Sequence, residues 1–265
     1  MVMMIRGLKL IFIGGFLFLS GCNPLSMKSS NIPVKPDNVQ EHLMKKPIPR
    51  NFVPSNLTVV AIGDSLTAGV GDTENNGGYV GDVSDLLQKE ENISSVDVAN
   101  FGVKGHKTTD LLKVLQKKKV LEKLREADII LMTIGGNDIM KVTRNHIMDL
   151  ELEPYREEQP FFEKRMKKIF QTVRTANPDA VIVYTGLYNP FKLMLPELGE
   201  IDTIVEEWNR TSSSIVMKDG NAIFIPIEDI FSRKSVANLL YTDEFHPSET
   251  GYSLIADRVY SSLSD

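Results

Sequence analysis

The chain has 265 residues, a length that suits one domain or two small ones. Hydrophobic residues make up 42% of it and charged residues 25%, which excludes a wholly disordered chain, a collagen and a polytopic membrane protein. The net charge of −5 argues against a general nucleic-acid binder, and a single cysteine excludes an intramolecular disulfide framework.

Residues 1–21 have the pattern of a secretory signal peptide. Arg6 and Lys9 make its start positive, and the apolar run 10–19 that follows is too short to cross a bilayer. The run leads into Leu-Ser-Gly-Cys, which resembles the lipobox of bacterial lipoproteins, where the cysteine is lipidated and becomes the mature N-terminus. We therefore expect Cys22 to carry acyl chains. The alternative is an uncleaved anchor with an unmodified cysteine.

Residues 22–56 predict a tether between this lipid and a folded domain. Six of the 13 prolines fall in the segment, which shows no sustained hydrophobic period. We expect the domain, residues 57–265, to be held at the cell membrane by its lipid, facing away from the cytoplasm.

From residue 57 onward, short apolar runs alternate with amphipathic stretches. The runs rich in β-branched residues predict five strands, at 57–62, 96–100, 129–134, 181–185 and 222–225. These runs are almost continuously apolar, which is typical of a parallel sheet covered by helices on both faces.

Apolar residues at three- to four-residue spacing predict helices over 162–173 and 201–208. The leucines between 111 and 124 predict either one helix or two shorter ones. Strands and helices in this order predict a three-layer α/β/α sandwich with a mostly parallel five-stranded sheet, flavodoxin-like in plan. Ligands of such folds bind at the carboxyl ends of the strands, so motifs at those ends are candidate functional residues.

The first such motif, Gly63-Asp64-Ser65, follows the first strand. We expect Ser65 to be exposed near a helix N-terminus, with Gly63 leaving room for a substrate to approach the backbone. Thr67 stands where the GxSxG motif of α/β-hydrolases has its second glycine, so this is a different motif. A plain turn with a helix cap is the alternative, and we expect Asp64 to be a structural hydrogen-bond acceptor.

Two further motifs follow the second and third strands. The segment 100–105 ends in Gly105, whose backbone N–H a turn can present to a ligand. The Gly-Gly-Asn-Asp motif at 135–138 offers the side-chain amide of Asn137 as a donor. A simple turn and a helix-capping residue are the respective alternatives.

A fourth motif lies near the C-terminus, where Asp243 precedes His246 by three residues. A carboxylate in this position can accept a hydrogen bond from the imidazole Nδ1–H and leave Nε2 free to act as a base. Together the four motifs supply the nucleophile, base, orienting carboxylate and oxyanion donors that acyl transfer needs.

With these motifs in this order, the sequence resembles the SGNH hydrolases, also called GDSL esterases and lipases, over residues 58–259. The resemblance implies a catalytic triad and an oxyanion hole. The triad is Ser65, His246 and Asp243, and the oxyanion donors are the N–H groups of Ser65 and Gly105 and the amide of Asn137. It further implies hydrolysis of carboxylic esters, either lipid or lysophospholipid acyl esters or O-acetyl groups, without a metal or other cofactor.

Two alternatives of other kinds stay open. One is a catalytically silent, envelope-binding lipoprotein on the same fold, and the other is a metal-dependent hydrolase with Asp64, Asn137 and His246 as ligands. Many relatives have an acidic residue where this chain has His106, which lies either at the pocket rim or on the surface. The apolar segment 187–199 is either a wall of the acyl pocket or a packed loop.

Overall fold

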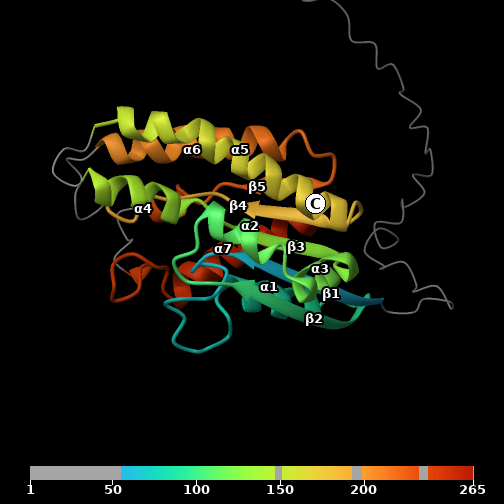
Figure 1. Ribbon diagram of the computed structural model, residues 1–265. Helices are drawn as coiled ribbons and strands as arrows, with labels where there is room; N and C mark the ends of the chain where they lie inside the picture. The colour runs from blue at the N-terminus through green and yellow to red at the C-terminus, as the bar shows by residue number, and fades with distance from the viewer. Residues whose placement is uncertain (1–54, 147–150, 193–198, 233–237, 265) are drawn as a thin grey trace, which may run out of the picture. The chain divides into compact units, whose positions relative to one another are not determined.

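The computed structural model of the protein describes residues 55–146, 151–192, 199–232 and 238–264 (Figure 1). The predicted signal peptide, the predicted lipidation site Cys22 and the predicted tether before Ser55 lie outside the described residues. In the part of the chain that is described, no helix is both long and apolar enough to cross a membrane.

Five parallel strands form one sheet, in the order β2-β1-β3-β4-β5. They are β1 (Ser55–Gly63), β2 (Ile93–Gly102), β3 (Ile129–Thr133), β4 (Val181–Thr185) and β5 (Ala222–Ile225). The predicted fold is confirmed, although β1 begins two residues before the predicted start of the domain. Because β1 lies between β2 and β3, its carboxyl end is a topological switch point, where ligands of such sheets bind.

The expectation that every strand is buried on both faces is wrong for β2. All ten residues of this strand are exposed or half-buried, and the strand also extends beyond both ends of the predicted range 96–100. The reason is its place at the edge of the sheet, where it pairs with β1 alone. Strands in the middle of the sheet, such as β3, are buried along their whole length.

Seven helices and one short 3₁₀ turn are found among the described residues. They are α1 (Tyr79–Gln88), α2 (Thr108–Val114), α3 (Lys118–Glu126), α4 (Gly136–Asn145), α5 (Glu153–Ala176), α6 (Gly199–Val216), η1 (Ile230–Ser232) and α7 (Glu249–Ser264). The two predicted helices lie within α5 and α6, and the leucines of 111–124 belong to two helices rather than one. The segments of α1 and α4 were not predicted to be helical.

The helices cover the sheet on both faces, so the fold has three layers (Figure 1). Alternate residues of a strand point to opposite faces. Val60 and Ile62 of β1 pack in one core with residues of α2 to α6, whereas Val59 and Ala61 pack in the other with residues of α1 and α7.

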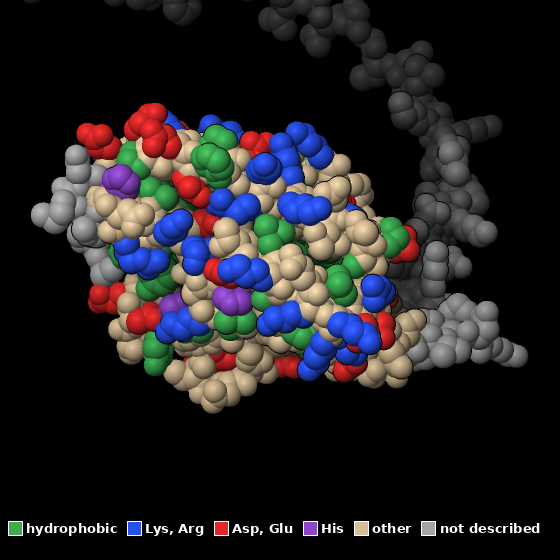
Figure 2. All heavy atoms as spheres, in the orientation of Figure 1, with side chains coloured by type: hydrophobic (Ala, Val, Ile, Leu, Met, Phe, Trp, Pro, Cys, Tyr) green, Lys and Arg blue, Asp and Glu red, His purple; other side chains and the backbone are tan. Residues whose placement is uncertain are grey.

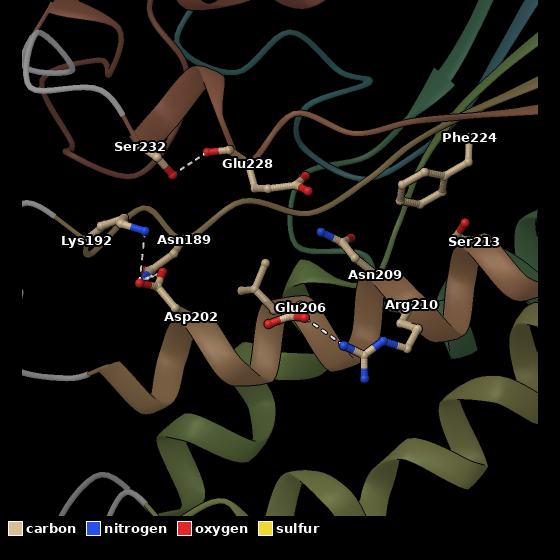
Figure 3. Close-up of a pocket in the computed structure, with 11 residues that line it drawn as sticks. Asn189, Lys192, Asp202, Glu206, Asn209, Arg210, Ser213, Phe224, Glu228 and Ser232 are labelled. Carbon is tan, nitrogen blue, oxygen red and sulfur yellow. Dashed lines mark hydrogen bonds and ion pairs between the residues drawn. The ribbon is translucent and has the colours of Figure 1, made fainter.

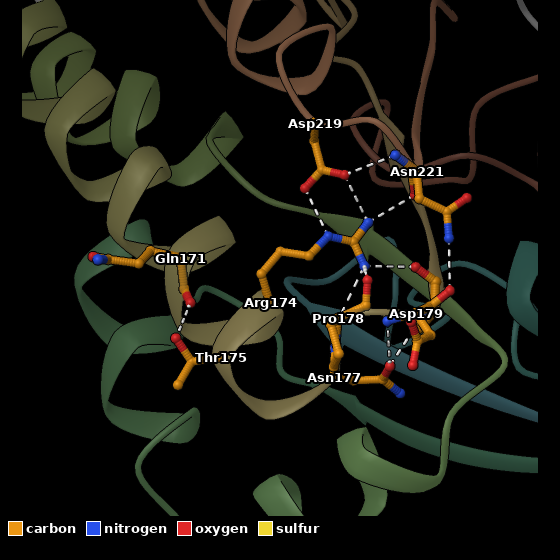
Figure 4. Close-up of polar contacts among 9 residues, drawn as sticks. Gln171, Arg174, Thr175, Asn177, Pro178, Asp179, Asp219 and Asn221 are labelled. Atoms are coloured by element: carbon orange, nitrogen blue, oxygen red, sulfur yellow. Dashed lines mark hydrogen bonds and ion pairs between the residues drawn. The ribbon is translucent and has the colours of Figure 1, made fainter.

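Arg174, near the end of α5, joins three segments at the amino ends of the strands (Figure 4). Its guanidinium donates to both carboxylate oxygens of Asp219, at 2.7 and 2.8 Å, and to the backbone carbonyls of Ala180 and Asn221, each at 2.7 Å. The hydrogen bonds from Arg174 lower the pKa of the Asp219 carboxyl although burial opposes this. Arg174 therefore ties α5 to the start of β4 and to the connection between α6 and β5, at the opposite end of the strands from the motifs.

Lysine and arginine side chains are spread over the face that carries α2, α3 and α5 (Figure 2). At the start of α3, the Lys118 side chain is 90% exposed, and its distance to the carboxylate of Glu122 is 3.7 Å. Exposed pairs of this kind contribute little to stability. The lysines at the start of α3 thus form a solvated helix end.

Candidate active site

Ser65 lies on a tight turn directly after β1. The turn is closed by backbone hydrogen bonds from Ala68 to Asp64 and from Val70 to Ser65, each 3.0 Å long. No regular helix follows, and Ser65 is only 3% exposed, so the expectation of an exposed serine at a helix N-terminus is wrong. The serine instead lines a small cavity of about 50 Å³ at the carboxyl edge of the sheet.

Gly63 is required by the neighbouring strand rather than by a substrate. Its φ is +147°, and a Cβ placed on it would lie 2.0 Å from the carbonyl oxygen of Thr133 on β3. Next to it, the Asp64 carboxylate accepts hydrogen bonds from the Leu66 N–H at 3.1 Å and the Thr133 hydroxyl at 2.7 Å. Burial raises the pKa of this carboxyl. Asp64 is therefore the structural acceptor that we expected.

Asn100, near the end of β2, binds the serine turn at Thr67. Its amide donates to the carbonyl of Thr67 at 2.6 Å and its side-chain oxygen accepts from the N–H of Gly102 at 2.8 Å. The sequence marks this residue only as the start of the 100–105 turn. The structure shows that it fastens the serine turn to the second strand.

Asn137 and Ser65 line the same cavity. The Asn137 amide nitrogen also donates to the backbone carbonyl of His106 at 3.1 Å, which brings it to the loop of Gly105. Gly105 itself is exposed, has a φ of +83° and does not line the cavity. His106 is half-buried and contacts the site through its carbonyl, while burial lowers the pKa of its imidazole.

Asp138 joins the loop of Gly105, after β2, to the loop of Asn137, after β3; these two are called the donor loops below. Its carboxylate accepts from the backbone N–H and the hydroxyl of Thr108 at 2.9 and 2.6 Å, and from Arg165 of α5 at 3.2 Å. Thr108 is the first residue of α2, so Asp138 caps the helix that follows the Gly105 loop rather than its own helix. Burial raises the pKa of the Asp138 carboxyl against the effect of these hydrogen bonds.

The predicted contact between Asp243 and His246 is present in the structure. One carboxylate oxygen lies 2.6 Å from the imidazole Nδ1, and the other accepts from the backbone N–H groups of Phe245 and His246 at 3.1 and 2.9 Å. Burial opposes ionisation of Asp243, but these hydrogen bonds outweigh it and lower the pKa of its carboxyl. The imidazole is buried, so the pair is held in one arrangement.

The histidine loop packs directly against the end of the serine turn. A Cβ placed on Gly71 would lie 2.4 Å from the carbonyl oxygen of Pro247 and 3.3 Å from the Cβ of His246. Phe245 lines the same cavity as Ser65. The structure therefore places the loop of Asp243 and His246 against the serine turn, and Ser65, Asn137 and Phe245 around one cavity, although they come from three separate segments.

Three residues that no motif marks hold these loops in place. The Tyr252 hydroxyl of α7 donates to the carbonyl of Val70 at 2.6 Å, and the Tyr188 hydroxyl donates to that of Phe245 at 2.5 Å. Asn209 of α6 accepts from the N–H of Leu187 at 2.7 Å and donates to its carbonyl at 2.9 Å. The described part of the 187–199 segment is thus both a packed loop and a wall of the cavity.

A larger, polar cavity of about 510 Å³ lies between α6 and the segments after β4 and β5 (Figure 3). Four of its five charged side chains form ion pairs, Lys192 with Asp202 at 3.0 Å and Arg210 with Glu206 at 2.6 Å. None of the motif residues lines it, so the chemistry of the motifs belongs to the smaller cavity. Among the described residues, no three His, Cys, Asp or Glu side chains are grouped to hold a metal ion.

Comparison with known proteins gives a consistent result. Residues 61–254 match the model of the GDSL-like Lipase/Acylhydrolase family. The chain is 43% identical over 209 residues to the uncharacterized protein YpmR of Bacillus subtilis, covering 78% of this chain and 82% of YpmR. It is 24% identical over 213 residues to the spore germination lipase LipC of Bacillus licheniformis, covering 77% and 94%.

Among solved structures, the lipase Lip_vut3 from a goat rumen metagenome has the same fold, with a TM-score of 0.70 and 23% identity over 78% of this chain and 97% of that one. The family match extends over most of the folded domain and includes the serine turn, both donor loops and the histidine loop. The chain therefore belongs to the GDSL-like lipase/acylhydrolase family of hydrolases.

Proposed function

We propose that this protein hydrolyses carboxylic esters, with Ser65 as nucleophile, His246 as general base and Asp243 as the carboxylate that orients the base. The observation that carries the proposal is the 2.6 Å contact between Asp243 and Nδ1 of His246, on a loop packed against the serine turn. A carboxylate on Nδ1 fixes the tautomer in which Nε2 accepts a proton.

The reaction then has two halves. His246 takes the hydroxyl proton of Ser65 as its oxygen attacks the ester carbonyl, and the C–O bond of the leaving alcohol breaks as His246 returns that proton to it. Water, deprotonated by the same histidine, attacks the acyl carbonyl. The bond from the Ser65 oxygen to the acyl group then breaks as His246 returns the proton to that oxygen, and the acid is released. The negative oxygen of each tetrahedral intermediate is stabilised by the N–H group of Ser65 and the amide of Asn137, which line the cavity. The N–H of Gly105, which does not line it, is the third donor that the family resemblance implies.

The ionisation of Asp243 suits this role. Its lowered pKa keeps the carboxylate charged throughout the pH range in which a histidine base operates, so it stabilises the imidazolium that forms in each half-reaction. Asp64 takes no part in proton transfer in this scheme, because its carboxylate is already engaged by Leu66 and Thr133.

The proposal includes attachment to the membrane through Cys22. The support is the sequence alone: a signal peptide pattern that ends in a lipobox at the only cysteine of the chain. Acyl labelling of the protein in cells tests it, with Cys22→Ser as the matched variant. The label and membrane retention should both be lost in that variant, and a soluble, unlabelled wild type would contradict the anchor.

The central experiment measures hydrolysis of p-nitrophenyl esters and labelling by a fluorophosphonate, which reacts with activated serines. Wild type should turn over esters and be labelled, and Ser65→Ala should do neither. Ser213→Ala, which changes a serine in the polar cavity, is the matched control and should keep both. If wild type neither hydrolyses any ester nor takes the label, the silent, envelope-binding alternative replaces the enzyme.

A further inference from the structure

We propose that the Ser65 cavity opens into an apolar channel that holds the acyl group of the substrate, and that Tyr155 and Thr143 close its far end and limit the acyl chain to medium length. The proposal rests on the esterase function above and names its substrate class. It favours esters of medium-chain fatty acids over O-acetyl groups.

The channel consists of two cavities that share part of their walls. A second cavity of about 50 Å³ adjoins the one that contains Ser65. The shared lining residues are Gly136, Leu187, Tyr188, Pro190 and Phe245. Because five residues line both spaces, the two cavities are neighbours, and in the proposed channel a chain bonded to Ser65 extends from the first into the second.

The direction of the channel follows helix α4. Gly136 at the start of this helix lines both cavities, whereas Ile139, Met140 and Thr143 line the second alone. Seven residues of helix rise by about 10 Å, so Thr143 lies roughly that far along the helix from the Ser65 end. Tyr155 of α5 stands beside Thr143, and its hydroxyl donates to the Thr143 hydroxyl at 2.9 Å.

The lining of the second cavity selects an apolar ligand. Its side-chain hydroxyls already have partners: Tyr155 donates to Thr143, Thr143 donates to the carbonyl of Ile139 at 3.1 Å, and Tyr188 donates to that of Phe245 at 2.5 Å. A polar group that enters would lose its hydrogen bonds to water without replacing them. A methylene group, in contrast, is stabilised by leaving water.

The apolar lining indicates which half of the ester lies there. Tyr155 and Ile204, which line the second cavity, are 2% and 3% exposed, so they close part of its wall. The alcohol must leave while the acyl group stays bonded to Ser65. An apolar cavity next to the serine therefore suits the acyl group.

The volume sets the length. Each of the two cavities has a volume of only about 50 Å³, which favours a short or medium acyl chain over a palmitoyl chain. We expect kcat/KM to rise from acetyl to a maximum between hexanoyl and decanoyl esters and to fall for palmitoyl.

The test compares p-nitrophenyl esters from acetyl to palmitoyl on the full chain and on two channel variants. Tyr155→Leu opens the far end, so the ratio of dodecanoyl to octanoyl kcat/KM should rise about tenfold. Ile139→Phe fills the channel, so the ratio of octanoyl to acetyl should fall about tenfold or more. A tenfold change in the kcat/KM ratio is the size expected when an apolar pocket gains or loses room for one or a few methylene groups. Tyr260→Leu, the same exchange on α7, is the matched control and should keep both wild-type ratios.

Three outcomes decide the proposal. If Ser65-dependent turnover is present but both variants keep the wild-type ratios, the channel is wrong and the esterase function stands. If Tyr155→Leu does not fold, as judged by circular dichroism, Ile139→Phe alone decides. If wild type hydrolyses no ester, calorimetric titration of Ser65→Ala with octanoate tests the channel by itself. Octanoate binding that Ile139→Phe abolishes supports it, and absence of binding overturns it together with the function.

Discussion

The hydroxyl of Tyr188 donates a 2.5 Å hydrogen bond to the backbone carbonyl of Phe245, the residue before His246. The ring of Tyr188 is stacked on Phe231 at 4.0 Å between centroids, so the donor itself is held in place. The loop after β4 and the histidine loop, more than fifty residues apart in the chain, are thereby joined next to the proposed base. Tyr188 is a positioning residue in this site.

Tyr188→Phe should lower kcat by about three- to tenfold, because one net hydrogen bond of about 0.5–1.5 kcal/mol no longer fixes the loop. KM should change less than kcat, since the ring that lines the cavity is retained. Steady-state kinetics with a short ester measure both values. Tyr260→Phe, which removes a hydroxyl that donates to Glu90, is the control, and equal kcat in the two variants would refute the role of Tyr188.

Asn137→Ala should reduce kcat by about 10²–10³ with little change in KM, because an oxyanion donor acts mainly in the transition state. The amide contact to the His106 carbonyl is also lost, so the unfolding free energy should be measured alongside. Asn145→Ala, at the exposed end of the same helix, should have wild-type kinetics. Turnover of Asn137→Ala at the wild-type rate would remove Asn137 from the mechanism.

Asp243→Asn should lower kcat by about 10⁴, because an amide does not hold the imidazole in the required tautomer. In the wild type, the lowered pKa of Asp243 means that this carboxylate is still charged when the base is protonated. The acid limb of the kcat/KM profile should therefore show a single ionisation. A second one above pH 4 would contradict the assignment, and Glu244→Gln on the same loop should leave the profile unchanged.

Asp219→Asn should destabilise the fold by about 1.5–3 kcal/mol at pH 7, since it breaks charge-assisted hydrogen bonds with Arg174. The folded pKa of Asp219 is lowered, so this stability is complete above its ordinary value of 3.8 and is lost as the pH falls below it. Denaturant unfolding at pH 7 and pH 3 should show the difference from wild type shrinking at low pH. Glu206→Gln, in an exposed pair, should show almost no difference at either pH.

The central sheet could be predicted closely because its signal is local. Strands β4 and β5 have the bounds that their apolar runs indicate, and the helix stripe at 162–173 is buried as its spacing requires. The exposure of β2 could not be predicted, because an apolar run does not reveal that its strand lies at an edge. Helix α1, which was not predicted, begins at Tyr79 directly after Gly77 and Gly78, two residues of a type common in loops.

The motif residues of the site were likewise visible in the sequence, since each belongs to a short pattern at the end of a strand or on one loop. The residues that hold them were not. Asn209, Tyr188 and Arg165 act on partners between 22 and 57 residues away, and nothing local distinguishes them from other residues of their helices and loops. Even for Ser65, the motif indicates the chemistry but not its burial.

Asp138 and Asn209 each hold a different part of the cavity wall in place by hydrogen bonds. Asp138 ties together the loops after β2 and β3, which carry the proposed oxyanion donors, while Asn209 secures the segment after β4, which forms the cavity wall. Among the described residues, no hydrogen bond joins Asp138 to Asn209. Reactivity and selectivity are thus separable on this scaffold: the wall after β4 can be exchanged for one of another shape while the groups that bond to the ester carbonyl keep their positions.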